Sequence, residues 1–205
     1  GELGKLLRLG GPMGLSTFID ISSFTLIAIL VARLGVETVA GHRVIANFTG
    51  VIYMLPLALS IATMVLVGQA VGANDPARAR LTARVGMGLT GGLAVLLGTV
   101  LWLLREPLVA LSTTDPAVQA VALGLVLYLC FYQGFDGLQT VAAHALRGYK
   151  VTLLPMLLHT FCFWGIGLSG GYWLSFHAPW RAGAPSVAGF WEGCVLATLA
   201  ATVLF

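Results

Sequence analysis

Charged side chains are scarce in this sequence. Of its 205 residues, 11 are Lys or Arg and 8 are Asp or Glu, which together make up 9% of the chain. A typical soluble domain carries about 25% charged residues, because its surface needs them to stay in water. Hydrophobic residues make up 58%, and the mean hydropathy is +0.93. The composition therefore excludes an ordinary soluble domain and indicates a protein that lives in a lipid bilayer.

Cysteine is also rare, and the motifs of several protein classes are missing. The three cysteines, Cys130, Cys162 and Cys194, all lie inside apolar stretches. An odd number without a loop cysteine predicts neither a disulfide framework nor a metal-binding spacing. The basic residues form no run of the kind that binds nucleic acid, and no catalytic triad, phosphate loop or haem motif is found. We therefore expect no enzyme, no cofactor and no nucleic-acid partner.

Long apolar runs are what the chain has in abundance. A transmembrane helix needs about 20 apolar residues. Runs of about this length predict six such helices, at 12–32, 43–71, 85–104, 117–146, 152–176 and 185–205. Strands of a membrane barrel have about 10 residues and alternate in polarity, unlike these runs. The predicted fold class is an all-α membrane protein, a bundle of six transmembrane helices.

Basic residues are distributed unevenly over the connections between these runs. The side of the N-terminus carries Lys5, Arg8, Arg78, Arg80, Arg84, Arg147 and Lys150, and the other side carries Arg33, Arg43, Arg105 and Arg181. Because cytoplasmic loops are enriched in Lys and Arg, we expect the N-terminus to be cytoplasmic. The tryptophans Trp173, Trp180 and Trp191 fit a belt at the membrane interface.

Two carboxylates, Asp20 and Asp136, lie deep inside predicted spans. A carboxylate near the centre of a span costs roughly 2.5 kcal/mol or more, so such residues usually serve a function. Residues three or four positions away share a helix face; they are Ser16 and Ser23 around Asp20, and Tyr132 and Gln139 around Asp136. Each aspartate therefore centres a polar stripe that should face a partner or a watery cavity.

The two aspartates are expected at a similar depth. Asp20 is roughly 12 Å from the cytoplasmic start of its span, and Asp136 roughly 15 Å from the cytoplasmic end of its own, at 1.5 Å per residue. Carboxylate, phenol and hydroxyl oxygens suit a hard cation such as sodium, and paired carboxylates can equally share a proton. The alternative is that the aspartates only form hydrogen bonds between helices.

Other polar residues rank lower as candidates. Asn47, one turn into the second span, can support the site by a bond between helices. Glu192 is close enough to a span end to reach the interface, where we also expect His42. His144 and His159 lie near span ends, and for each a proton relay and a packing role both stay open.

The order of several motifs resembles one family of transporters. They are RLGGPMGL at 8–15 leading to FID at 18–20, VAGHRVIANF at 39–48, MLPLALS at 54–60, VGQAVGANDP at 67–76, and YQGFD at 132–136 leading to LRGYK at 146–150. Together they resemble the second half of a MATE (multidrug and toxic compound extrusion) transporter of the NorM-like branch. The chain starts without Met and stops inside an apolar run, which also leads us to expect a fragment.

The resemblance implies that residues 1–205 form the C-terminal lobe of a twelve-helix transporter whose N-terminal lobe is a missing partner. It implies export of organic, often cationic, compounds across the bacterial inner membrane in exchange for sodium or protons. It also implies cation binding by Asp20, Tyr132 and Asp136. Two departures are an Asp at position 20, where Glu is more typical, and His159, where Asn is typical.

Two other functions stay open at this point. One is a flippase for lipid-linked sugars with related architecture, although it needs a large cationic cavity and the spans hold few Arg or Lys. The other is a membrane scaffold that transports nothing, in which the aspartates only join helices.

Overall fold

A computed structural model describes residues 2–177 and 186–205. These residues are almost entirely helical and contain no strand, which confirms the predicted fold class. The elements are α1 (Glu2–Val31), η1 (Ala32–Leu34), α2 (Val36–Gly72), α3 (Pro76–Leu103), α4 (Arg105–Ser112), α5 (Pro116–Gly148), α6 (Leu153–His159), η2 (Thr160–Gly170), α7 (Gly171–Phe176) and α8 (Val187–Leu204).

Six helical segments among the described residues are long and apolar enough to cross a bilayer. They are Leu9–Leu34, Val36–Gly72, Pro76–Leu103, Pro116–Gly148, Leu153–Phe176 and Val187–Leu204, and each overlaps one predicted span. The first three helices begin seven to ten residues before the predicted spans, because hydropathy marks the apolar part of a helix and not its polar first turns. Pro185, Trp180 and Arg181 lie outside the described residues, as do the side chains of Lys5 and Arg8.

Two of the long helices begin at a proline that follows an aspartate. Asp75 accepts a hydrogen bond of 2.9 Å from a backbone N–H in the first turn of α3, which starts at Pro76. Asp115 does the same at 2.8 Å for α5, which starts at Pro116. In each case the aspartate side chain binds a backbone N–H that has no partner within the helix. Proline fits the first position of a helix because it has no backbone N–H that would need a partner there.

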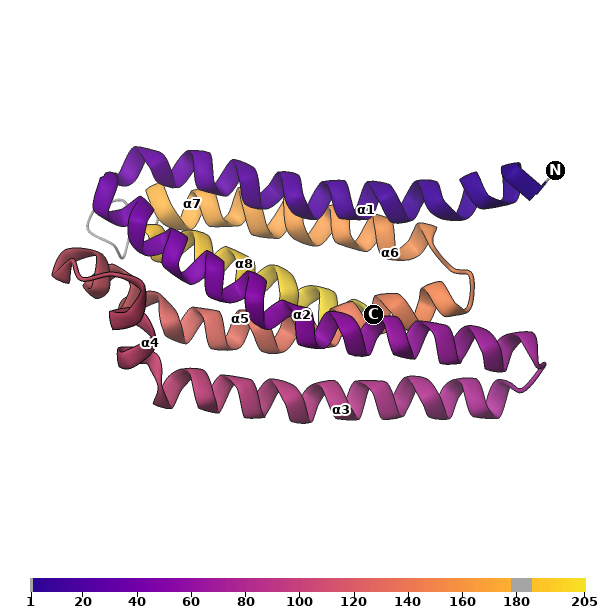
Figure 1. Ribbon diagram of the computed structural model, residues 1–205. Coiled ribbons are helices and arrows are strands. Elements are labelled where there is room, and N and C mark those ends of the chain that lie inside the picture. Colours follow the sequence, from indigo (N-terminus) through magenta and orange to yellow (C-terminus); the bar gives the residue numbers. More distant parts are fainter. Residues whose placement is uncertain (1, 178–185) are drawn as a thin grey trace.

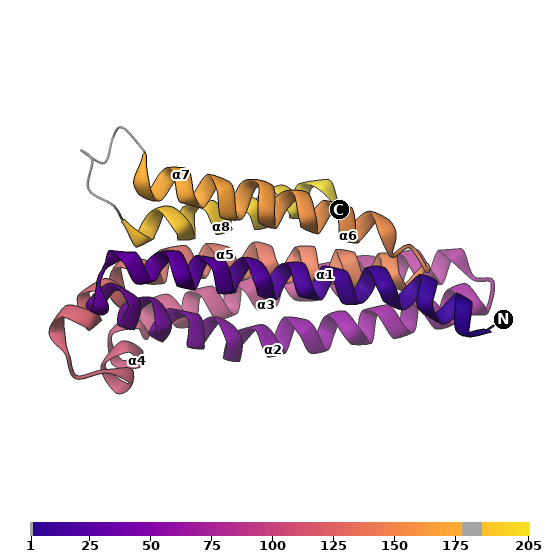
Figure 2. The ribbon, with the colours of Figure 1, turned by 90° about the horizontal axis from the view of Figure 1, so that it is seen from above.

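The long helices lie side by side along one direction (Figure 1). The chain start, the α2–α3 turn and the α5–α6 connection share one end of the bundle, whereas η1 and α4 lie at the other end. Seen from above, α7 and α8 lie along one side and α2 along the opposite side (Figure 2). Helix α5 is central, because it packs against α2, α3 and α8, while α1 runs along α6 and η2.

The fifth span is helical as predicted, but it is not one regular α-helix. Its middle part, η2, is a π-helical segment of 11 residues between two short α-helices. π-Helical turns are rare and often occur at functional sites. Close packing of this span against α8 accompanies the irregularity: a Cβ atom at Gly193 would be 2.6 Å from Cα of Gly171 and 2.7 Å from the carbonyl oxygen of Gly167.

His42 and Trp191 are both inside the bundle, so the expectation that they are interfacial is wrong. Their exposed fractions are 5% and 2%, and the Trp191 indole N–H donates to Nδ1 of His42 at 3.3 Å. A tryptophan can be buried when its N–H finds a partner, and His42 supplies one. Trp173 is 48% exposed, as an interfacial residue would be.

The outer surface of the bundle is largely apolar. Exposed fractions reach 74% for Val51, 71% for Val95 and 77% for Val203, on three different helices. Such a surface is unfavourable in water over so large an area. Together with the six spans, it identifies a multi-pass membrane protein.

Candidate cation site

Asp20 on α1 forms a contact with a histidine from another span. Its Oδ1 lies 3.0 Å from Nδ1 of His159, the last residue of α6. The Asp20 side chain is 36% exposed, and that of His159 only 5%. The role of His159 was open from the sequence, and the structure places it directly against one of the two candidate carboxylates.

Asp136 on α5 is buried, with an exposed fraction of 5%. Its Oδ1 accepts a hydrogen bond of 3.0 Å from Nε2 of Gln139, which also lies 3.2 Å from the Thr140 hydroxyl. Gln139 is thus the polar partner that its spacing of three residues indicated. One oxygen of the Asp136 carboxylate already has an N–H donor from its own helix.

The fold brings the two aspartates within electrostatic range of each other. Asp136 lies close enough to Asp20 and His159 for electrostatic interaction. Tyr53 of α2 also interacts with both aspartates. Four elements, α1, α2, α5 and α6, therefore contribute to one polar cluster inside an otherwise apolar bundle.

Tyr132 is part of this cluster and is held by aromatic neighbours. It is 3% exposed, and its ring lies edge-on to Phe24 at 5.8 Å and to Trp191 at 5.9 Å between centroids. Both aspartates interact with it electrostatically. Edge-to-face packing of this kind fixes a ring in place, so the position of the phenol is determined by α1 and α8.

The two serines of the Asp20 stripe are buried, as the stripe requires. Ser16 is 1% exposed and donates to a carbonyl of its own helix at 2.9 Å. Ser23 is 2% exposed and donates to the carbonyl oxygen of Phe163 at 3.3 Å. Ser23 therefore joins α1 to η2, whereas Ser16 binds within α1.

Asn47 is not part of the buried cluster, and a supporting role for it stays a prediction. Its side chain is exposed on α2. The inward face of this helix turn is formed instead by Ile45 and Thr49, with exposed fractions of 0% and 9%. A position between these two points outward because successive residues of a helix are about 100° apart.

Glu192 lies between two helices and not only at an interface. The Tyr128 hydroxyl on α5 donates to its Oε1 at 3.0 Å, and Glu192 itself is on α8 and partly buried. His144 on α5 contacts the Thr140 carbonyl oxygen at 2.8 Å and an Arg147 nitrogen at 3.4 Å.

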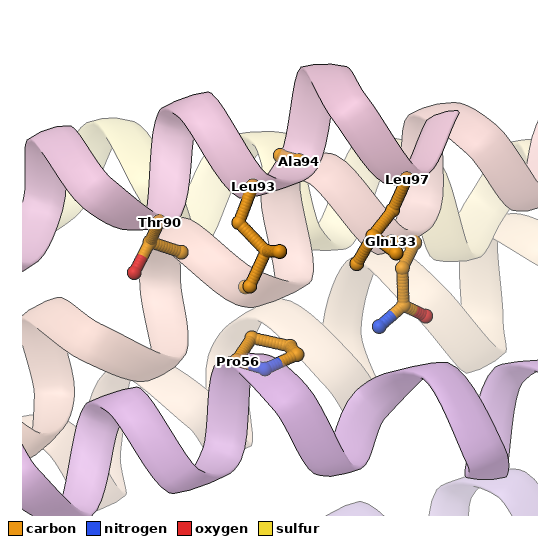
Figure 3. A pocket seen from close by; sticks show the side chains of 7 residues that line it. Pro56, Thr90, Leu93, Ala94, Leu97 and Gln133 are labelled. Carbon is orange, nitrogen blue, oxygen red and sulfur yellow. The ribbon is translucent and has the colours of Figure 1, made fainter. Parts of the chain in front are cut away.

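A small cavity lies next to the Asp136 turn, between α2, α3 and α5 (Figure 3). Its volume is about 10 Å³, and its lining residues are Pro56, Thr90, Leu93, Ala94, Leu97, Gln133 and Gly137. Gln133 is 4% exposed, and within the described residues neither of its amide atoms has a hydrogen-bond partner. The same holds for the Thr90 hydroxyl.

Sequence reasoning missed Tyr53 as a member of the cluster. The only available signal was a polar side chain inside a predicted span, three residues before Pro56. As a whole, the cluster offers oxygens from two carboxylates and two phenols, which can bind a hard cation. It also offers an imidazole that can hold a proton.

The family model MatE matches residues 12–173 of the chain. A protein named probable multidrug resistance protein NorM from Aromatoleum aromaticum is 70% identical over 204 residues, which is 100% of this chain and 44% of that protein. Multidrug resistance protein PmpM from Pseudomonas aeruginosa is 38% identical over 202 residues, covering 98% of this chain and 42% of its own. The chain spans less than half the length of these relatives.

Solved structures show the same fold at low sequence identity. The eukaryotic MATE transporter AtDTX14 superimposes with a TM-score of 0.89 at 20% identity, over 98% of this chain and 44% of that one. An outward-facing multidrug resistance MATE transporter of the MOP superfamily superimposes with a TM-score of 0.87 at 16% identity, over 98% of this chain and 44% of that one. Six helices of this chain thus correspond to about half of such a transporter. The chain belongs to the MATE family, whose members are membrane transporters and not enzymes.

Proposed function

We propose that this chain is the C-terminal lobe of a multidrug exporter that expels organic, often cationic, compounds in exchange for sodium or protons. The names of its relatives, which are multidrug resistance proteins, support the substrate class. A missing N-terminal lobe would supply the other half of the substrate site. The composition of the connections supports a cytoplasmic N-terminus for this chain, in a bacterial inner membrane.

The observation that supports the proposal is that Asp20 and Asp136 belong to one polar cluster inside the bundle. They come from spans far apart in the sequence, yet their charges interact. Two nearby carboxylates repel each other, and a bound cation relieves that repulsion. In a membrane interior of low dielectric, this gives the site a strong preference for one added positive charge.

Ion binding can drive transport only if the two access states of the protein differ in affinity for the ion. The cluster is built from α1, α2, α5 and α6, so any movement of α1 relative to α5 changes the separation of the carboxylates. The ion would thereby favour the state in which Asp20 and Asp136 are closest. The organic cation would be released from that state and bound by the other.

The test is efflux of ethidium from cells that express the full-length protein containing this chain. Asp136→Asn removes one carboxylate charge and should lower the initial efflux rate at least about tenfold, since about 1.4 kcal/mol of lost ion binding corresponds to a factor of ten. Glu106→Gln on α4 is the matched control, because the Glu106 side chain is 74% exposed and outside the cluster. It should retain the wild-type rate at equal membrane abundance.

Two other results would contradict the role of Asp136 or the exporter proposal itself. Wild-type efflux with an equally active Asp136→Asn variant would show that this aspartate only joins helices. Absence of ethidium efflux by the wild-type protein would contradict the exporter proposal and favour the flippase or the scaffold.

A further inference from the structure

The two ends of the bundle differ in charge. The chain start, the α2–α3 turn and the α5–α6 connection lie at one end, and η1 and α4 lie at the other (Figure 1). Within about two turns of the first end, the described side chains include five basic residues and one acidic residue, which are Arg78, Arg80, Arg84, Arg147, Lys150 and Asp75. The second end has three basic and four acidic residues, which are Arg33, Arg43, Arg105, Glu37, Glu106, Asp115 and Glu192. Only the first end therefore has an excess of positive charge that attracts an anionic partner.

Three of these basic side chains are on the first turns of α3. Arg78, Arg80 and Arg84 are all exposed, and none of them has an ion pair among the described residues. Arg80 donates to the carbonyl oxygen of Pro76 in its own helix at 3.2 Å. Asp75 caps the helix instead, because its Oδ1 accepts from the backbone N–H of Arg78. The guanidinium groups thus keep most of their N–H donors for a partner outside the chain.

Lys150 is brought to the same end by the packing of α5. Tyr149 packs against the buried cluster that contains Val67 of α2 and Ala79 of α3. A Cβ atom at Gly148 would be 2.9 Å from Cγ1 of Val67, so α5 and α2 are in close contact here. Lys150 directly follows Tyr149 and is exposed. Four exposed cations from two parts of the chain form what we call the basic patch, Arg78, Arg80, Arg84 and Lys150.

An apolar strip continues from the basic patch along α3. Leu81, Val85 and Leu89 are each at least half exposed. Their spacing of four residues places them on one face of the helix, and Arg78 precedes Leu81 by three residues on that face. In a membrane protein, exposed apolar side chains of this kind contact acyl chains. Helix α3 therefore presents cations near its start and an apolar strip that leads toward the middle of the bilayer.

Arg84 is placed deeper than the other cations. It lies about 12 Å along α3 from Pro76, next to Val85 and beyond Leu81. A guanidinium at such a depth is costly unless its long side chain reaches the interface. Arg80 is one turn nearer the end, and like charges four residues apart repel each other. A phosphate group bound between the two arginines would offset both costs, because a guanidinium binds phosphate through two parallel N–H bonds.

We propose that the basic patch binds the phosphate of an anionic phospholipid, whose acyl chains lie along the apolar strip. A free phosphate would use the arginines but would leave the apolar strip without a role. A zwitterionic lipid carries its own cation, which the basic patch would repel. The inference is independent of the proposed function, because it concerns the outer surface of α3 and not the cation site.

The experiment measures lipid binding by the full-length protein that contains this chain, purified in detergent. Native mass spectrometry counts the lipids that stay bound to the intact protein. The probes are dioleoyl phosphatidylglycerol, which is anionic, and dioleoyl phosphatidylcholine, which is zwitterionic. The wild type should bind at least one phosphatidylglycerol about tenfold or more tightly than it binds phosphatidylcholine. The double variant Arg80→Gln/Arg84→Gln should lose one such tight site, because each basic residue near a membrane surface adds to the attraction for anionic lipid.

A matched control comes from the other end of the bundle. Arg33→Gln/Arg43→Gln also removes two exposed arginines, and it should keep the full number of tight sites. A further measurement needs no variant. Raising the ammonium acetate concentration from about 0.05 M to about 0.5 M should weaken the tight site of the wild type about tenfold or more, because salt screens exposed charges. Binding of phosphatidylcholine should change less than about twofold.

Three outcomes would overturn the inference. One is that Arg80→Gln/Arg84→Gln keeps every tight site, or loses no more than the control does. Another is that the wild type binds both lipids equally well at low salt. The third is displacement of phosphatidylglycerol by an equal concentration of inorganic phosphate, which would assign the basic patch to a free phosphate and not to a lipid.

Discussion

The hydroxyl of Ser23 donates a hydrogen bond of 3.3 Å to the backbone carbonyl of Phe163, which joins α1 to η2. Ser23 is three residues after Asp20, and Phe163 is four residues after His159. The bond therefore lies about one helical turn from the Asp20–His159 contact on both elements. It fixes the register of the two spans that supply the pair.

Replacing Ser23 by Ala should loosen this register. The variant loses a buried hydrogen bond, which should lower the free energy of unfolding by about 1 kcal/mol. Ser22→Ala is the matched control, because the Ser22 hydroxyl bonds to the Ile19 carbonyl within α1. Thermal unfolding in detergent, followed by tryptophan fluorescence, compares the two. Equal stabilities would mean that Ser23 does not hold α1 to η2.

A methyl group at Gly193 should separate α8 from the fifth span. Its Cβ would be 2.6 Å from backbone atoms of Gly171, which cannot turn away as a side chain can. Overpacking of this kind costs about 1–3 kcal/mol, so Gly193→Ala should unfold at lower temperature. Gly124→Ala on α5 meets nothing within 4 Å and should instead gain up to about 1 kcal/mol from helix propensity. If both variants are stabilised, the close contact of α7 and α8 is not present in the protein.

The amide of Gln133 should be dispensable for stability. Both of its polar atoms are buried without a partner among the described residues, and removing such a group with a side chain of similar shape is nearly neutral or stabilising. Gln133→Met should therefore keep or raise the unfolding temperature. Leu129→Ala, one turn away and 0% exposed, should lower the free energy of unfolding by about 2–5 kcal/mol. A clear loss in Gln133→Met would show that the amide binds a molecule in the adjoining cavity.

Tyr53 should contribute to ion binding if the cluster is the coupling site. Tyr53→Phe removes the hydroxyl from an α2 side chain that lies within electrostatic range of both Asp20 and Asp136. The ion concentration for half-maximal transport should rise about tenfold, which corresponds to about 1.4 kcal/mol, with little change in maximal rate. Tyr172→Phe on the exposed side of α7 should leave both values unchanged. A loss of maximal rate at unchanged ion affinity would instead assign Tyr53 to the transport movement.

Much of the fold follows from local sequence. Apolar runs of about 20 residues mark all six spans, since a helix is the only way for such a run to satisfy its backbone in lipid. The two aspartates stood out for the same reason, because a carboxylate inside an apolar run is costly. Their partners within one helix, such as Gln139 for Asp136, followed from a spacing of three residues.

Contacts between spans could not be predicted in this way. By hydropathy, Asn47 and His159 are alike, since each is a polar residue near the end of an apolar run. In the structure, however, Asn47 is exposed, whereas His159 is only 4% exposed and contacts Asp20. Trp191 looked interfacial from its type and position, but His42 on another helix provides a partner for its N–H. The rotation of each helix decides these outcomes.

The sequence by itself determined that this chain is a six-span membrane bundle with carboxylates at two interior positions, because burial in lipid acts on each span separately. Only the tertiary structure decided that Asp20 meets His159, that Tyr53 joins the cluster, and that the fifth span widens into a π-helix against α8. The physical reason is that these features depend on how closely two helices approach and how each is rotated. Both are set by side-chain packing between residues far apart in the chain.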